Sequence, residues 1–215
     1  MSLVVRTLAA GYEEVGDVLA GHLAADPSWG CQLVVRTDEG LVVDLASDSE
    51  ADDPLHVVAS VTKGVAGVTV ALALQTAGVD PGERVAALWP EFAAEGKSAV
   101  TIAQLLSHQV GLLATTRDFT VREWGEDGAV AADLAAQRPL WAPGRVHGYH
   151  ALTVGPLADE LVRRLTGLPL WRFYEEQVRA PLEADFWVRL PDAQSARLRE
   201  VVVPPSGPAG TPDGA

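Results

Sequence analysis

The stretch from Val57 to Ala77 constrains the fold most, because Lys63 is its only charged residue. Its aliphatic side chains recur at spacings that suit a helix, and Gly78 and Pro81 follow it as a typical signal for a helix end. A helix that is apolar on every side is normally buried. The sequence therefore predicts a buried helix over this stretch.

Short strands are predicted before this helix and further helices after it. Apolar residues at helical spacing predict a helix over 13–25 that ends at Asp26-Pro27. The β-branched runs Cys31–Arg36 and Leu41–Leu45 flank a turn with Gly40, which indicates a β-hairpin. Later helices are predicted after the capping box Thr101–Gln104 and over Ala129–Gln137, Leu152–Leu165 and Trp171–Val178.

Length and composition fit one globular domain with a tail. The chain has 215 residues, of which 48% are hydrophobic and 21% charged, as is typical of a protein that buries a large core. We predict one domain over residues 1–200. Residues 201–215 have the Pro and Gly content of a linker and are predicted to form a tail.

Charge and cysteine content limit the partners. The formal net charge is −13, so nucleic acid and anionic membrane surfaces are unfavourable partners. No apolar run reaches the roughly eighteen residues of a membrane-spanning helix, and the N-terminus lacks a secretory signal pattern, so we expect a cytoplasmic protein. Cys31 is the only cysteine, which excludes an intrachain disulfide. The sequence leaves the oligomeric state open.

Lys63 lies three residues after Ser60 and is one of only two lysines, with Lys97, among 16 basic residues. Positions three apart share a helix face, where their side chains can form a hydrogen bond. Serine is a weak nucleophile until a nearby base takes its proton, and a lysine can be that base when burial favours its neutral form. At the start of a helix, the Ser60 N–H could also form half of an oxyanion hole.

The same spacing has a purely structural interpretation. Ser60 can cap the helix N-terminus while the Lys63 side chain extends along the surface and keeps its ammonium group in water. The two residues alone do not separate these interpretations, so the rest of the chain has to be considered.

Three motifs follow one another along the sequence. Residues 59–64 (Ala-Ser-Val-Thr-Lys-Gly) carry the Ser-x-x-Lys spacing at the head of the predicted helix. Residues 105–112 read Leu-Leu-Ser-His-Gln-Val-Gly-Leu, and Trp-Ala-Pro-Gly at 141–144 precedes Gly-Tyr-His-Ala-Leu-Thr at 148–153. In order and spacing, residues 12–190 resemble the β-lactamase-like superfamily of serine hydrolases, and within it the esterase and class C β-lactamase branch.

The resemblance implies a fold, a reaction and a third site residue. The fold is mixed α/β (α+β) of the β-lactamase/transpeptidase type, in which a helix and a β-hairpin begin an antiparallel sheet and a helical region follows. Tyr149 matches the family tyrosine that moves the serine proton, so the implied catalytic residues are Ser60, Lys63 and Tyr149. The implied reaction is acyl transfer to water from a small-molecule ester or amide, without a cofactor. Ala151 replaces an asparagine common in β-lactamases, which favours esters.

One feature departs from the family pattern. The third family motif, His-x-Gly or Lys-Thr-Gly on a strand, normally follows the position where this chain ends, so we expect a truncated chain without the C-terminal strands of the sheet. The alternative function is a non-catalytic remnant that acts as a binding or interaction module. The missing strands motivate this alternative, because without them the hairpin has an unpaired edge and the Ser60 helix an uncovered apolar face. Tyr149 has a structural interpretation of its own, as a turn residue whose hydroxyl caps a loop.

Other site types are not indicated. The sequence has no Gly-x-Ser-x-Gly motif, which disfavours an α/β-hydrolase. The five histidines lack metal-ligand spacing such as His-Glu-x-x-His, and the nearby glycines disfavour a metal pair of His147 and His150. We expect His108 to end its helix, where the helix dipole favours a positive charge.

Overall fold

The computed structural model of the chain describes residues 2–26, 28–47, 50, 52, 54–125 and 128–201. The chain divides into two compact units, of which the first is Met1–Val57 with Pro191–Ala215 and the second is Val58–Leu190. The predicted tail, apart from Val201, lies outside the described residues.

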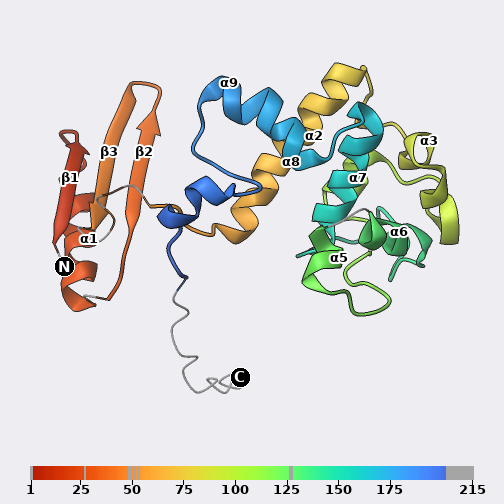
Figure 1. The fold of residues 1–215 in the computed structure, drawn as a ribbon, viewed down its shortest axis with the longest axis horizontal. Helices are drawn as coiled ribbons and strands as arrows, with labels where there is room; N and C mark the ends of the chain where they lie inside the picture. Colours follow the sequence, from red (N-terminus) through yellow and green to blue (C-terminus); the bar gives the residue numbers. More distant parts are fainter. Residues whose placement is uncertain are drawn as a thin grey trace. The chain divides into compact units, whose positions relative to one another are not determined.

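The first unit contains a three-stranded antiparallel sheet (Figure 1). The strands β1 (Leu3–Leu8), β2 (Gln32–Thr37) and β3 (Gly40–Ser47) pair in the order β1-β3-β2. Gly40 has a φ of 118°, which glycine adopts without steric cost and which closes the tight turn between β2 and β3. The predicted hairpin is confirmed, whereas the sequence analysis did not predict β1.

One helix packs on this sheet. α1 (Glu13–Ala25) has the predicted bounds, and its Leu19 joins Val43 and Leu45 of β3 in a small core. In the same unit the 3-10 helix η5 (Asp192–Arg197) leads to Leu198, which forms a parallel bridge with Leu55. This unit therefore joins an early and a late part of the chain.

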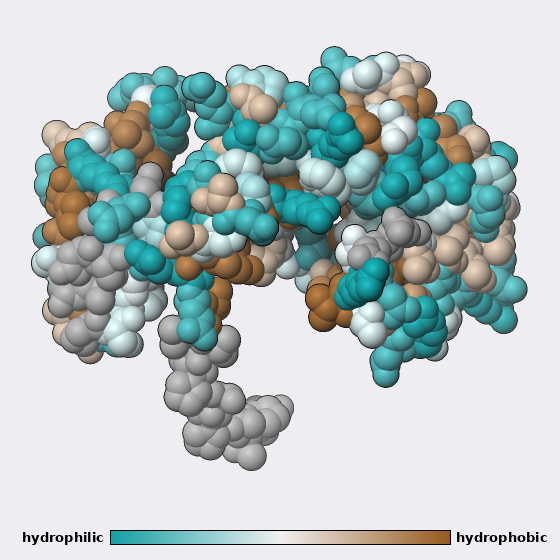
Figure 2. Space-filling view, viewed as in Figure 1, coloured by the Kyte–Doolittle hydropathy of each residue, from teal (hydrophilic) through white to brown (hydrophobic). Residues whose placement is uncertain are grey.

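The second unit is helical. The face of the chain shown in Figure 2 carries separate hydrophobic patches between hydrophilic groups. Among the described residues, no helix combines the length and the apolar composition that crossing a bilayer requires. The elements of the second unit are η2 (Ala59–Val61), α2 (Thr62–Ala77), α3 (Val85–Leu88), η3 (Pro90–Gly96), α4 (Ile102–Leu106), α5 (Val121–Gly125), α6 (Ala129–Ala136), α7 (Val154–Thr166), α8 (Leu170–Tyr174), η4 (Glu175–Arg179) and α9 (Ala180–Leu182).

Most predicted helices of this unit lie close to observed ones. The capping box is confirmed, because the Thr101 side chain accepts the Gln104 N–H at 3.2 Å and the Gln104 side chain accepts the Thr101 N–H at 3.1 Å. The helix predicted over Trp171–Val178 differs, since α8 passes at Glu175 into the wider π-helical turn η4. An ion pair between Glu175 and Arg179 spans that turn, with a hydrogen bond of 2.7 Å.

α2 buries one face and exposes the other. Val70 is inaccessible to solvent in a core that α7 and α8 share, and Gly78 ends the helix with a φ of 66°. On the outer face, Val68 is 60% exposed, and Val61, which precedes the helix in η2, is 64% exposed. The prediction of a helix buried on every side is therefore wrong, because the neighbouring helices of the described chain cover only one side of its apolar surface.

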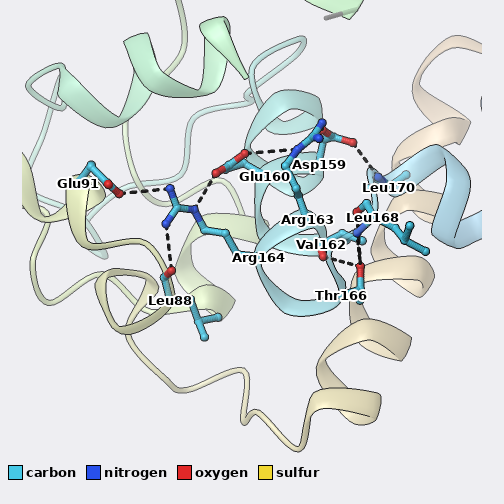
Figure 3. Close-up of polar contacts among 10 residues, drawn as sticks. All are labelled: Leu88, Glu91, Asp159, Glu160, Val162, Arg163, Arg164, Thr166, Leu168 and Leu170. Atoms are coloured by element: carbon cyan, nitrogen blue, oxygen red, sulfur yellow. Dashed lines mark hydrogen bonds and ion pairs between the residues drawn. The ribbon is translucent and has the colours of Figure 1, made fainter. Parts of the chain in front are cut away.

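Polar contacts hold α7, the helix that follows the Tyr149 loop (Figure 3). The Arg164 guanidinium donates to the Leu88 carbonyl at 3.2 Å and to Glu91 at 3.2 Å. Asp159 accepts the N–H of Leu170 at 2.7 Å. These contacts tie α7 to the end of α3, to η3 and to the start of α8.

Candidate active site

Ser60 lies in the 3-10 turn η2, directly before α2. The preceding residue, Ala59, has a φ of 44°, in the left-handed region that residues other than glycine seldom adopt. Such a conformation costs on the order of 1–3 kcal/mol and persists where the surrounding structure enforces it. The turn leaves Ser60 exposed at the N-terminal end of α2.

Lys63 is in the first turn of α2 and is half-buried. Its Nζ donates a hydrogen bond of 3.0 Å to the Oγ of Ser60. The predicted contact between side chains three positions apart is therefore present. The structural interpretation in which Lys63 extends away from Ser60 does not match this geometry.

Tyr149 reaches the same oxygen from the loop that precedes α7. Its hydroxyl donates to the Ser60 Oγ at 2.8 Å, and Lys63 Nζ lies 5.0 Å from its ring centroid, a cation–π arrangement. The hydrogen bond with Ser60, and next the interaction with Lys63, hold the pKa of the Tyr149 phenol below its usual range. All three residues predicted for the site are thus brought together.

This geometry allows proton exchange at one oxygen. Two proton-bearing groups, an amine and a phenol, both lie within hydrogen-bond distance of the Ser60 hydroxyl. A proton can be shared within such a coupled pair, so that one member accepts while the other donates. The arrangement can activate a hydroxyl and later protonate a leaving group.

Two histidines that the sequence analysis did not assign to the site lie behind Tyr149. The His108 ring meets the Tyr149 ring edge to face, with centroids 5.1 Å apart. His150 is fully buried, stacks on His108 at 5.3 Å and accepts the N–H of Leu112 on Nε2 at 3.0 Å. The available signals were the position of His150 next to Tyr149 and of His108 within the motif at 105–112.

His108 does end its helix as predicted, because the N–H groups of His108 and Gln109 donate back to the carbonyls of Leu105 and Gln104, but the predicted positive charge is not favoured. α4 ends at Leu106, and His108 follows in a left-handed conformation with a φ of 62°. Burial, and next the positive charge of Lys63, lower the pKa of the His108 imidazole. The neutral ring is therefore favoured.

The structure gives no support to a metal pair of His147 and His150. His147 Nδ1 donates to the Ser107 carbonyl at 3.0 Å, while His150 bonds to His108 and Leu112. Within the ranges that the structure describes, no three His, Cys, Asp or Glu side chains gather in a way that could hold a metal ion.

A cavity of about 980 Å³ opens near the first turns of α2. Thr62 and Ala66 line it, together with Trp171 and Arg189, whose guanidinium lies 4.9 Å from the Trp171 ring centroid. Ser60, Lys63 and Tyr149 are not among its lining residues. Ser60 is exposed and does not belong to this cavity.

Comparison with known proteins identifies the family. Residues 12–215 match the family model described as Beta-lactamase. The chain belongs to the beta-lactamase family. A curated member of similar sequence, the esterase/beta-lactamase LipL of Mycobacterium tuberculosis, is 31% identical over 157 residues, which are 71% of this chain and 35% of LipL.

Solved structures of the beta-lactamase fold superpose on most of the chain. EstA of Arthrobacter nitroguajacolicus is 36% identical with a TM-score of 0.88, covering 98% of this chain and 57% of EstA. A family VIII carboxylesterase is 33% identical with a TM-score of 0.83, covering 94% of this chain and 58% of that structure. A penicillin-binding protein homologue of Caulobacter crescentus is 31% identical with a TM-score of 0.86, covering 97% of this chain and 58% of that homologue. The chain thus spans between a third and three fifths of these relatives.

Proposed function

We propose that this chain is a serine hydrolase that cleaves small carboxylic esters through an acyl-enzyme. The observation that carries the proposal is the double hydrogen bond to the Ser60 Oγ, from Lys63 at 3.0 Å and Tyr149 at 2.8 Å. A hydroxyl needs a base to become a nucleophile, and these are the groups that can take its proton.

The steps follow from these positions. The Ser60 Oγ attacks the ester carbonyl carbon, and its proton passes to whichever of Lys63 and Tyr149 is deprotonated. The C–O bond to the alcohol breaks as that proton reaches the leaving oxygen, which leaves the acyl group on Ser60. Water then attacks the acyl-enzyme, gives a proton to the same pair, and releases the carboxylic acid as the Ser60 hydroxyl re-forms.

Two observations favour esters over β-lactams. Ala151, two residues after Tyr149, offers no side-chain donor for the amide of a lactam substrate. One similar protein is named a family VIII carboxylesterase, whereas the name of LipL includes both esterase and beta-lactamase. Because the chain spans only part of each relative, the substrate class belongs to the proposal.

A fluorophosphonate probe and a p-nitrophenyl ester test this function. We expect the native chain to be labelled and to release p-nitrophenol, and we expect Ser60→Ala to do neither. Ser98→Ala, which removes an exposed serine elsewhere in the same unit, is the control and should behave like the native chain. Equal labelling of the native chain and Ser60→Ala would exclude Ser60 as the nucleophile.

Lys63→Arg separates the charge of Lys63 from its ability to lose a proton. Arginine keeps the positive charge but is effectively never deprotonated in proteins. If Lys63 takes part in proton transfer, Lys63→Arg should lose labelling about as fully as Lys63→Ala. If Lys63→Arg is labelled as fast as the native chain, Lys63 does not transfer a proton and acts only through its positive charge beside Tyr149.

The exposed outer face of α2 supports a second candidate, a non-catalytic binding or interaction module. Val61 and Val68 are more than half exposed, and surfaces of this kind often mark places where another chain binds. This candidate predicts a folded chain that the probe does not label. The labelling experiment therefore distinguishes the two functions.

A further inference from the structure

Hydrogen bonds on both sides of Tyr149 tie its loop to the segment that follows α4. Before Tyr149, the N–H of Gly148 donates to the His108 carbonyl at 3.0 Å. After it, the N–H of His150 donates to His108 Nδ1 at 3.1 Å, and the N–H of Leu112 donates to His150 Nε2 at 3.0 Å. The two imidazoles thus take part in the contacts that hold this loop.

These contacts determine where the ring protons lie. His150 Nε2 accepts a hydrogen bond, so the proton of the neutral ring is on Nδ1. His108 Nδ1 also accepts one, so it has no proton and can receive the Nδ1–H of His150 across 3.2 Å. His108 then carries its proton on Nε2. A second proton on either ring would set two N–H donors against each other, so the arrangement requires both rings to be neutral.

We propose that His108 and His150 are positioning residues that hold the Tyr149 hydroxyl against Ser60. The proposal rests on the function proposed above, in which Tyr149 exchanges a proton with Ser60. Tyr149 is 55% exposed, so burial alone does not fix its orientation. The backbone anchored by His150 and the edge-to-face contact with the His108 ring supply that constraint.

The titratable groups around the two rings favour their neutral forms. Burial is the main cause that lowers the pKa of His108, and Lys63 and His147 lower it further. Burial is also the main cause that lowers the pKa of His150 to about 4, with His108 as the next cause. Tyr149, whose ring contacts the His108 ring, adds no positive charge. Near neutral pH the pair can therefore keep its hydrogen bonds.

His150→Leu and His150→Gln in the full chain test the proposal. Leucine has a similar volume but neither accepts the Leu112 N–H nor donates to His108, whereas the glutamine amide can do both. We expect the rate of fluorophosphonate labelling to fall about tenfold to a hundredfold in His150→Leu, as misplaced catalytic groups usually cause. The rate should stay close to the native value in His150→Gln.

A spectroscopic readout makes the test independent of catalysis. The ultraviolet titration of Tyr149 is obtained by subtracting the curve of the same protein carrying Tyr149→Phe. We expect the phenol pKa of Tyr149 to rise toward the ordinary tyrosine value in His150→Leu and to stay lowered in His150→Gln. If the native chain is not labelled at all, the proposed function fails and this titration alone decides the positioning role. An unchanged titration in His150→Leu would overturn that role.

Thr153→Val is the matched control for a simple loss of stability. The Thr153 hydroxyl donates to the Leu112 carbonyl at 2.6 Å in the same buried region. The variant should lower the melting temperature while Tyr149 titrates as in the native chain. A rise of the Tyr149 pKa in Thr153→Val equal to that in His150→Leu would overturn the proposal.

If His150→Leu does not fold, two variants of His108 replace it. His108→Ala removes the acceptor, whereas His108→Asn keeps an oxygen at the place of Nδ1 and tolerates the left-handed backbone. The Tyr149 pKa should rise in His108→Ala and stay lowered in His108→Asn. Equal values in the two variants would contradict the proposal.

Discussion

Tyr149 is more than half exposed, yet its hydroxyl donates a hydrogen bond to Ser60 and its ring lies beside the Lys63 ammonium. An isolated tyrosine titrates near pH 10, too high to accept protons readily at neutral pH. The interactions with Ser60 and Lys63 lower its pKa, which increases the fraction of phenolate at a given pH. Contacts at the surface therefore lower the phenol pKa, whereas burial by itself would raise it.

Replacing this hydroxyl should affect chemistry more than binding. We expect Tyr149→Phe to slow acylation by roughly a hundredfold, the range for loss of a general acid or base, because the aromatic ring stays and only the proton carrier is lost. Single-turnover release of p-nitrophenol measures the rate, and the substrate concentration dependence gives the binding constant. Unchanged turnover, or a loss confined to binding, would reject a role in proton transfer.

His150 should make folding stability depend on pH. Its pKa is about 4 in the folded chain and near 6.5 when exposed, so the unfolded state binds more protons between these values. Above about pH 6.5 His150 is neutral in both states and adds no pH dependence. As pH falls from there to about 4, the free energy of unfolding decreases by roughly 1–3 kcal/mol because the unfolded state takes up the proton. Urea unfolding at a series of pH values measures this loss. His150→Gln should lack this part of the slope, and identical slopes in both proteins would contradict the assignment.

Sequence reasoning at this scale succeeded where the contact was local. Ser60 and Lys63 are three positions apart, and one helical turn is enough to bring them together. Tyr149 lies 89 positions from Ser60, and only the resemblance of motifs suggested its role. The contact of His108 with His150 spans 42 positions and depends on the turn of two loops, which no periodic pattern encodes.

At the scale of secondary structure, elements with a physical start or stop signal were predicted well. The capping box at Thr101 and the left-handed glycine at Gly78 mark the helix ends that the sequence indicated. β1 was missed because a short apolar run at a chain end has no turn signal before it, and its pairing with β3 is a long-range contact. The π-helical turn η4 was missed because helical periodicity assumes 3.6 residues per turn.

Gly148 lets the Tyr149 loop pass close to an indole. A Cβ at this position would overlap Cη2 of Trp141 and lie 3.0 Å from its Cζ2, while the Trp141 N–H donates to the Gln109 carbonyl at 3.2 Å. We expect Gly148→Ala to destabilise the chain by about 1–3 kcal/mol, as overpacking does, and to slow labelling of Ser60 by shifting Tyr149. Thermal unfolding and labelling rates measure the two effects.

Gly67→Ala is the matched control for this substitution. Gly67 is inside α2, and nothing lies within 4 Å of the position that its Cβ would occupy. Alanine favours a helix over glycine by about 1 kcal/mol, so this variant should be as stable as the native chain or more stable. If Gly148→Ala and Gly67→Ala both lose stability, the room available for a Cβ atom does not explain the effect of Gly148→Ala.

At the scale of the whole molecule, Ser60, Lys63 and Tyr149 all come from the helical unit, Val58–Leu190. The sequence predicted a mixed α/β fold with a sheet at the start and helices afterwards, and this is confirmed. It did not predict which side of α2 is covered, because the helix is apolar around its whole circumference. Composition determines how much apolar surface is favourable to bury, whereas the arrangement of α7 and α8 determines which residues of α2 are buried.

The same polar substitution should cost much less stability on the exposed face of α2 than on the buried face. Val68 is 60% exposed on the outer face, so Val68→Gln should change the unfolding free energy by no more than about 0.5 kcal/mol and should reduce binding of a hydrophobic dye. Val70 is inaccessible two positions further along, so Val70→Gln should cost roughly 2–4 kcal/mol by placing an amide in the core. Urea unfolding of both variants at several protein concentrations measures the difference. A large cost at Val68 that grows with concentration would show that a second copy of the chain covers this face in solution.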